Sequence, residues 1–167
     1  MEFDIDVSGE DLLSKDYVIC IASDNIIKGY KITKTFVNII NSRFGQGIYK
    51  YEKSQKGKAN LKVRIYCVIL FYLFKSIHPL IKNKSINLNV CRDFNGKDNQ
   101  IKLNIQSLLI TNLKLKLDID NLNFCKLKSD SSAHHYSGLM RKDFKNQFKE
   151  NYVNIKIEDI EKYLIKE

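Results

Sequence analysis

Residues 59–77 constrain the fold of this chain more than any other part of the sequence. The stretch contains neither glycine nor proline, it is apolar on nearly every side after Arg64, and it stops before His78-Pro79 as a helix does. A helix that is apolar all round must be covered on every side, so the sequence predicts a buried central helix in a layered domain. The strongly apolar run 65–74 is only about half the length needed to cross a bilayer. We therefore expect a core element and no contact with a membrane.

The rest of the chain alternates between strand and helix patterns. Residues 17–22 and 26–33 are runs of strand formers around the turn signal Ser23-Asp24-Asn25, which predicts an antiparallel hairpin. The polar residues 53–58 fit a mobile loop, and residues 35–44 fit either a helix or a strand. Further strands are expected at 48–52, 86–91 and 122–127, and further helices at 101–109, 131–149 and 158–165. This order predicts an α/β fold, with a mixed β-sheet that has an N-terminal antiparallel hairpin and flanking helices.

The length of 167 residues fits a single α/β domain that spans residues 1–167. Within it, residues 150–167 are assigned to a C-terminal helix and residues 1–16 to an acidic N-terminal segment. Two structures fit the acidic segment. It can be a strand and loop packed against a basic body, or a mobile segment that occupies the same groove as a ligand.

The charge of the chain is distributed unevenly. Residues 1–24 hold seven acids and one lysine, so they carry −6, and the remaining 143 residues carry +15 of the total of +9. Such a basic body favours polyanions such as nucleic acid, because lysine and arginine neutralise phosphates and release counterions. A lysine-rich surface that only keeps the protein in solution explains the charge equally well.

The four cysteines indicate a reducing compartment. Cys20, Cys67, Cys91 and Cys125 lie far apart in apolar runs and form no CxxC pair, which favours buried reduced thiols over a zinc site or a disulfide framework. The N-terminus has no basic region followed by an apolar stretch, so it does not resemble a signal peptide. We expect a cytoplasmic (intracellular) protein.

Three acids follow predicted strands. Asp24 follows the first strand of the hairpin, Asp93 follows residues 86–91, and Asp130 follows residues 122–127. Carboxyl ends of strands often meet at one edge of a sheet, and converging carboxylates need a hard cation such as Mg²⁺ or Mn²⁺. Each acid also has a structural explanation, because Asp24 and Asp93 lie in turn sequences and Asp130 can cap the following helix.

With an early hairpin, a buried helix, alternating strands and helices, and acids at these places, the chain resembles the ribonuclease H-like superfamily. The resemblance spans residues 17–148, and the segment KSDSSAHHYSG at 128–138 is similar to the last strand-to-helix junction of that superfamily. The resemblance implies that Asp24, Asp93 and Asp130 are metal ligands and catalytic residues, with His134 as a further ligand or proton shuttle. The buried helix has no Asp or Glu, although many members place an acid there. An inactive relative that only binds nucleic acid is therefore an alternative.

These observations lead to the hypothesis of a metal-dependent nuclease, or nuclease-like protein, that acts on RNA, DNA or a hybrid. The chain has no complete glycine-rich phosphate loop and no GxSxG or HExxH motif, which argues against the enzyme classes built on them. One alternative is a noncatalytic nucleic-acid-binding module, and another is a subunit that recruits a protein partner and has no enzymatic activity. Candidate phosphate contacts are Lys62, Arg64, Arg92, Arg141 and Lys145.

The aromatic residues near the end of the predicted helix 131–149 are expected to be structural. Phe144 and Phe148 are four residues apart, a spacing that places both on one face of a helix. With Tyr136 they are therefore assigned to the core rather than to base stacking.

Overall fold

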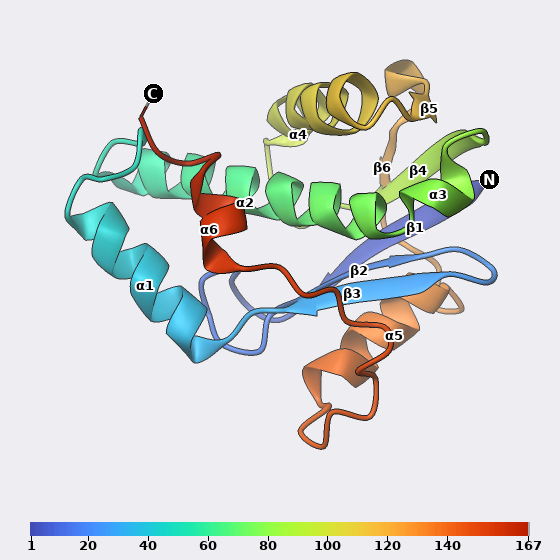
Figure 1. The fold of residues 1–167 in the computed structure, drawn as a ribbon, viewed down its shortest axis with the longest axis horizontal. Helices are drawn as coiled ribbons and strands as arrows, with labels where there is room; N and C mark the ends of the chain where they lie inside the picture. The colour runs from blue at the N-terminus through green and yellow to red at the C-terminus, as the bar shows by residue number, and fades with distance from the viewer. Residues whose placement is uncertain (167) are drawn as a thin grey trace.

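The computed structural model describes residues 1–166 and contains a six-stranded mixed sheet with helices on both faces (Figure 1). The strand order is β3-β2-β1-β4, and the far edge of β4 pairs with β5 at one end and with β6 at the other. Strand β2 runs antiparallel to both of its neighbours, β1 and β3, whereas β1, β5 and β6 all run parallel to β4. The strands are β1 (Glu2–Ser8), β2 (Val18–Ala22), β3 (Ile27–Lys31), β4 (Ser85–Cys91), β5 (Lys116–Leu117) and β6 (Asn123–Cys125). The α/β class, the mixed sheet and the antiparallel hairpin β2–β3 are confirmed.

The acidic N-terminal segment forms strand β1, which lies between β2 and β4. Its residues alternate, so that Phe3 and Ile5 are fully buried in the main core while Asp4 and Asp6 point to the opposite face. Of the two structures that the sequence allowed for this segment, the packed strand is the one found.

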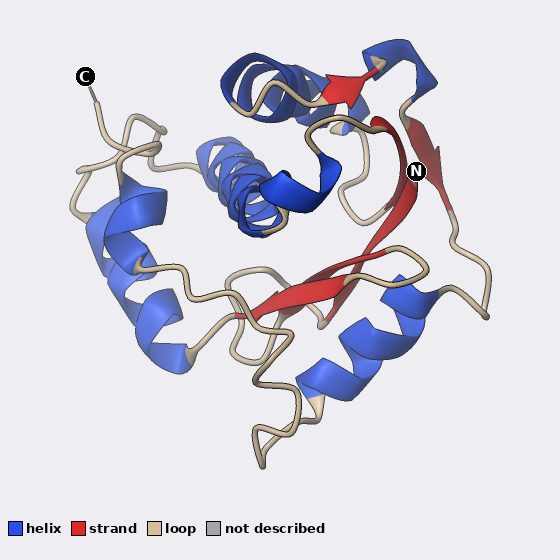
Figure 2. Ribbon diagram, turned by 45° about the vertical axis from the view of Figure 1, so that its right-hand side comes forward, coloured by secondary structure: helices blue, strands red, loops and turns tan. Residues whose placement is uncertain are grey.

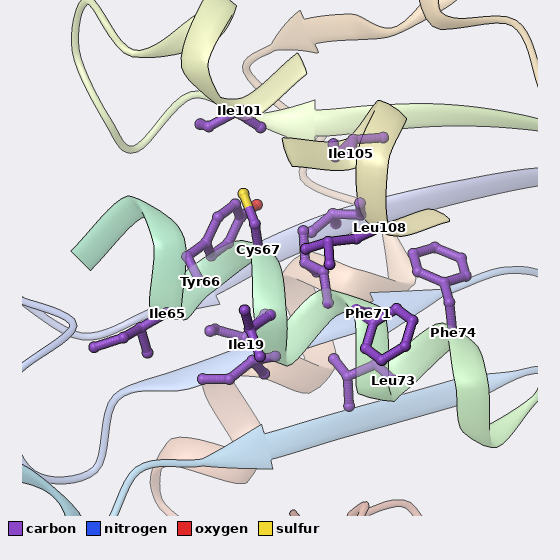
Figure 3. Packing of buried hydrophobic residues seen from close by; sticks show 14 of the residues in the cluster. Ile19, Ile65, Tyr66, Cys67, Phe71, Leu73, Phe74, Ile101, Ile105 and Leu108 are labelled. Carbon is purple, nitrogen blue, oxygen red and sulfur yellow. The ribbon is translucent and has the colours of Figure 1, made fainter. Parts of the chain in front are cut away.

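Helix α2 (Gln55–Ser76) lies between the sheet and a further helical layer, which explains why its sequence is apolar all round (Figure 2). Figure 3 shows Ile19 of β2 on one side of α2 and Ile101, Ile105 and Leu108 of the outer layer on another. That layer consists of α4 (Asp98–Ile105) and the π-helix η1 (Gln106–Asn112). The predicted central helix is confirmed, whereas the mobile loop expected at 53–58 is wrong. Ser54 caps the helix by accepting the Gly57 N–H at 3.0 Å, and α2 therefore starts within that stretch.

The other face of the sheet is covered by α5 (Ser132–Arg141), which packs on β1, β2 and β3. The prediction of a helix over 131–149 is correct only for its first half, because α5 ends at Arg141. The chain then turns back, and Asn151 and Val153 form backbone hydrogen bonds with Gly29 at the edge of β3. Phe144 is 81% exposed in this irregular segment, so its assignment to the core is wrong. Phe148 instead packs against the small cluster of Val18, Cys20 and Met140.

Residues 35–44, which fitted either a helix or a strand, belong to α1 (Lys34–Gly45). The strand expected at 48–52 is absent from the described chain apart from one isolated bridge between Tyr49 and Ile165. The remaining elements are the short helices α3 (His78–Ile81), η2 (Ile119–Asn121) and α6 (Ile157–Glu161). α6 is much shorter than the helix expected at 150–167. Within residues 1–166, no helix has the length and apolar character required to span a bilayer.

Candidate functional site

Two carboxylates meet where β1 and β4 end. Asp6 lies near the end of β1 and Asp93 follows β4 by two residues, and the two strands are parallel neighbours, so their carboxyl ends lie at the same edge of the sheet. One potential ligand atom each from Asp6, Cys91 and Asp93 lies within 4.8 Å of the others. Among the described residues this is the one group of three or more metal-ligating side chains as close as that. We call Asp6, Cys91 and Asp93, with their neighbours His134 and Ser137, the Asp6–Asp93 site.

The carboxylate of Asp6 is buried and held by α5. The residue is only 3% exposed, and its Oδ2 accepts a hydrogen bond from Ser137 Oγ at 3.1 Å and lies 2.9 Å from His134 Nδ1. Ser131 caps α5 by accepting the His134 N–H, and this cap sets the start of the helix that carries both partners. His134 has a side chain that is 61% exposed, so its ring joins the buried carboxylate to the surface.

Once Asp6 is ionised, the surroundings of the site disfavour a second negative charge on Asp93 or Cys91. Although Asp93 as a whole residue is exposed, loss of water around its carboxyl group, followed by the negative charge of Asp6, raises the pKa of Asp93 to about 6. Burial, together with the charges of Asp93 and Asp6, raises the pKa of Cys91 to about 12, so its thiol stays protonated at neutral pH. A cation between the two carboxylates would offset this repulsion.

A second polar group lies further back on the same face of β1. Asp4 accepts hydrogen bonds from Asn89 Nδ2 at 2.9 Å and from Ser131 Oγ at 2.7 Å. Asn89 also donates to Glu2 at 2.9 Å. These contacts satisfy the Asp4 carboxylate and tie β1 to β4 and to the start of α5, which identifies Asp4 as a structural acid.

The structure brings two of the predicted catalytic residues, Asp93 and His134, together with Asp6. It does not bring Asp24 or Asp130 into the group. Because β2 runs antiparallel to β1, its carboxyl end pairs with Asp4, and Asp24 follows in the β2–β3 turn at the opposite end of the sheet from Asp93. Asp130 lines a hollow with Asp24, Glu2 and Asp4. The expectation that the three predicted acids converge is therefore wrong.

Asp6 was missed because residues 1–16 were interpreted through their net charge. The alternation in EFDIDV, with apolar residues at every second position, is the signal that predicts a half-buried strand. Recognising that strand would have placed Asp4 and Asp6 on one face of the sheet.

The predicted phosphate contacts are dispersed. Lys62 lines a cavity together with Asp93. Arg64 donates hydrogen bonds to Asn104 and to the carbonyl of Tyr163, and Arg92 lies 3.4 Å from the carboxylate of Asp98. Arg141 lines a different hollow with Lys142 and Phe144, and Lys145 is exposed in the segment after α5. Of the five residues, Lys62 is the one that shares a cavity with the Asp6–Asp93 site.

Comparison with known proteins gives no relative: no family model, no curated protein and no solved structure matches the chain.

Proposed function

We propose that this protein is a metal-dependent nuclease whose cation is held by Asp6 and Asp93. The observation that carries the proposal is the approach of these two carboxylates at the ends of parallel strands, where no lysine or arginine of residues 1–166 forms an ion pair with either of them. Within residues 1–166, Asp93 forms no ion pair at 4.0 Å or less, and Asp6 forms one only with His134. Paired carboxylates of this kind are unfavourable unless a cation neutralises them.

The donor set fits a hard divalent ion. Carboxylate oxygens are the ligands of Mg²⁺ and Mn²⁺, and Mg²⁺ commonly takes one or two carboxylates and completes its shell with water and substrate phosphate. The Cys91 thiol adds no charged ligand, because burial and the acids beside it raise its pKa and keep it protonated. A divalent ion held by Asp6 and Asp93 would supply activation of a water molecule and stabilisation of the leaving oxygen of a phosphodiester.

The residues on α5 position the site and move protons. Ser137 and His134 fix the orientation of the Asp6 carboxylate through its Oδ2. Because Nδ1 of His134 faces Asp6, Nε2 is the ring nitrogen left to exchange a proton with water or with a leaving oxygen. His134 is thus proposed as the proton shuttle of the reaction.

We also propose that the fold is ribonuclease H-like. Support comes from the hairpin that precedes the buried helix α2, from the parallel pairing of β1 with β4, and from an acid after β4. Asp6 on β1 takes the place that the sequence-based hypothesis gave to Asp24. The proposal thus keeps the reaction class and changes the ligand set.

A cleavage assay tests the function and the ligand set together. We expect Mn²⁺-dependent cleavage of at least one of four labelled substrates, namely single-stranded RNA, single-stranded DNA, duplex DNA or an RNA–DNA hybrid. Asp6→Asn and Asp93→Asn should each reduce the rate at least about 100-fold, because each removes a ligand charge. Asp24→Asn and Asp130→Asn are matched controls that should retain the wild-type rate.

Two results would contradict the proposal. Loss of cleavage in Asp24→Asn with retention in Asp6→Asn would restore the ligand set predicted from the sequence. Salt-dependent binding without cleavage of any substrate would support the noncatalytic nucleic-acid-binding module instead. That alternative is favoured by one observation, the presence of only two carboxylates in the metal-ligating group of the described chain.

A further inference from the structure

A cavity of about 420 Å³ opens beside Asp93, on the side away from α5. Its walls come from the loop that follows β1, from the first turns of α2 and from the segment after β4. This volume lies within the range of small-molecule binding sites, roughly 300–1,000 Å³. The cavity is therefore large enough for one nucleotide unit and is adjacent to a proposed metal ligand.

The lining of this cavity combines buried apolar side chains with lysines. Leu12, Tyr17 and Val63 are buried, and Phe94 is half-buried next to Asp93. The lysines are Lys58 and Lys62, one helical turn apart on α2, and Lys97, whose Nζ donates to Asn60 at 2.9 Å. An apolar surface with convergent ammonium groups suits a ligand that has a planar or sugar part and a phosphate.

One of these lysines is already paired with an acid from the loop after β1. Lys62 Nζ lies 2.5 Å from Asp11 Oδ2, and Asp11 Oδ1 accepts the N–H of Leu13 at 2.8 Å. Burial would raise the pKa of Asp11, but the hydrogen bonds from Lys62 and from the Leu13 N–H, with the charges of Lys62 and Lys58, outweigh it and the pKa is lowered. Asp11 is thus an ionised carboxylate at a position where a phosphate would meet the same lysines.

The charges of the cavity balance as it stands. Its lining holds three lysines, Lys58, Lys62 and Lys97, and three acids, Glu10, Asp11 and Asp93. Within residues 1–166 no lysine lies within 4.0 Å of the Asp93 carboxylate. A cation at Asp93 and displacement of Asp11 would each leave the cavity positive. A phosphate that contacts Lys62 here competes with Asp11 for the same ammonium group.

We propose that this cavity binds the nucleotide next to the scissile phosphodiester of a nucleic-acid strand, with Lys58, Lys62 and Lys97 contacting its phosphate and Asp11 competing for Lys62. The inference rests on the proposed function, because it places the cleaved bond at Asp6 and Asp93. It adds the substrate subsite and a built-in competitor for that subsite.

The test is fluorescence anisotropy with a labelled oligothymidine in EDTA, where metal-dependent cleavage does not take place. Lys62→Gln and Lys58→Gln should each weaken binding about fivefold and make the dependence on salt less steep, by roughly 0.7 in the log–log slope for a single strand. Asp11→Asn should strengthen binding about threefold. In the double variant Asp11→Asn/Lys62→Gln that gain should disappear, because Lys62 is the lysine with which Asp11 forms its ion pair.

Two further measurements make the test specific. Lys84→Gln is the matched control, since Lys84 precedes β4 at the opposite end of the sheet, and it should change binding less than twofold. An abasic strand of the same length should bind about threefold more weakly than oligothymidine to the wild type if the apolar part of the cavity takes a base.

The outcomes separate this inference from the proposed function. Equal effects of Lys62→Gln and Lys84→Gln, or an Asp11→Asn gain that persists without Lys62, would overturn the subsite whether or not Mn²⁺ supports cleavage. The expected binding pattern without any cleavage would overturn the nuclease activity and leave a nucleotide-binding cavity.

Discussion

At the scale of single residues, Asp93 has an ionisation that is coupled to its neighbour. The pKa of Asp93 is raised to about 6 by loss of water and by the charge of Asp6. A carboxyl group whose pKa is higher in the folded state binds more protons there than in the unfolded chain between its two pKa values. The contribution of Asp93 to the free energy of unfolding should therefore fall as the pH rises from about 4 to about 6. Above about pH 6 this contribution should no longer change.

This coupling predicts that Asp93→Asn stabilises the metal-free protein at pH 7. We expect a gain of about 1 kcal/mol, because solvent screens a partly exposed charge. The gain should vanish below about pH 4, where Asp93 is protonated in both states. Urea unfolding in EDTA between pH 4 and pH 8 measures it, with Asp24→Asn as the control. A loss of stability at pH 7 would show that Asp93 forms a favourable ionic contact instead.

Phe144 and Phe148 differ in how far their side chains are buried. Phe144 is 81% exposed, whereas Phe148 lies against Tyr136 with ring centroids 6.0 Å apart and packs on the cluster beneath α5. Phe144→Ala should therefore change the free energy of unfolding by less than about 0.5 kcal/mol. Phe148→Ala should cost about 2 kcal/mol, less than a fully buried phenylalanine. Chemical denaturation of the two variants, side by side, distinguishes this arrangement from the continuous helix that the sequence suggested.

At the scale of elements, the start of α2 depends on a glycine for steric reasons. A Cβ atom at Gly57 would lie 1.9 Å from the carbonyl oxygen of Glu52. The backbone of Glu52 therefore lies directly against Gly57 in the first turn of α2, the end of the helix that Ser54 caps. This contact positions the turns of α2 that carry Lys58 and Lys62.

Gly57→Ala should therefore destabilise the protein by about 2 kcal/mol or more, although alanine is normally the better helix former. Gly138, within α5, is the matched control, because a Cβ there meets no atom within 4 Å. Gly138→Ala should stabilise by about 0.5–1 kcal/mol. Thermal unfolding of both variants checks the contrast, and equal effects of the same sign would refute the close approach at Glu52.

The elements also show where sequence patterns are informative. The central helix, the hairpin β2–β3 and the strand β4 follow from periodicity, because each buries a defined face. Helix α5 was predicted too long, since the charged residues after Arg141 do not mark its end and the return of the chain to Gly29 is a tertiary contact. The sequence did not decide the structure of residues 1–16, which contain strand β1, because their acids fit a mobile segment as well as a strand.

At the scale of the whole molecule, the acidic strand β1 lies at the centre of a basic protein. Residues 1–24 carry −6 and the remaining residues +15, and the sheet places part of that negative charge at the Asp6–Asp93 site. A divalent cation that binds the folded state alone should stabilise the whole domain through mass action.

Mn²⁺ at about one hundred times its Kd should add about 2.7 kcal/mol, which corresponds to a rise in Tm of roughly 5–10 °C for a chain of this size. Asp6→Asn and Asp93→Asn should abolish the rise, while Asp24→Asn and Asp130→Asn should keep it. Differential scanning calorimetry with and without Mn²⁺ measures it. A rise that survives in both Asp6→Asn and Asp93→Asn would place the cation elsewhere.

The sequence by itself determined the α/β class, the buried helix α2, the hairpin, and the candidacy of Asp93, because these depend on local periodicity and on strand ends. His134 became a candidate only through the resemblance to the ribonuclease H-like superfamily. Only the tertiary structure decided which acids meet. The direction of each strand, and not its sequence, sets the edge of the sheet at which its carboxyl end lies. Antiparallel pairing sends Asp24 to one end of the sheet, while parallel pairing of β1 with β4 brings Asp6 to Asp93.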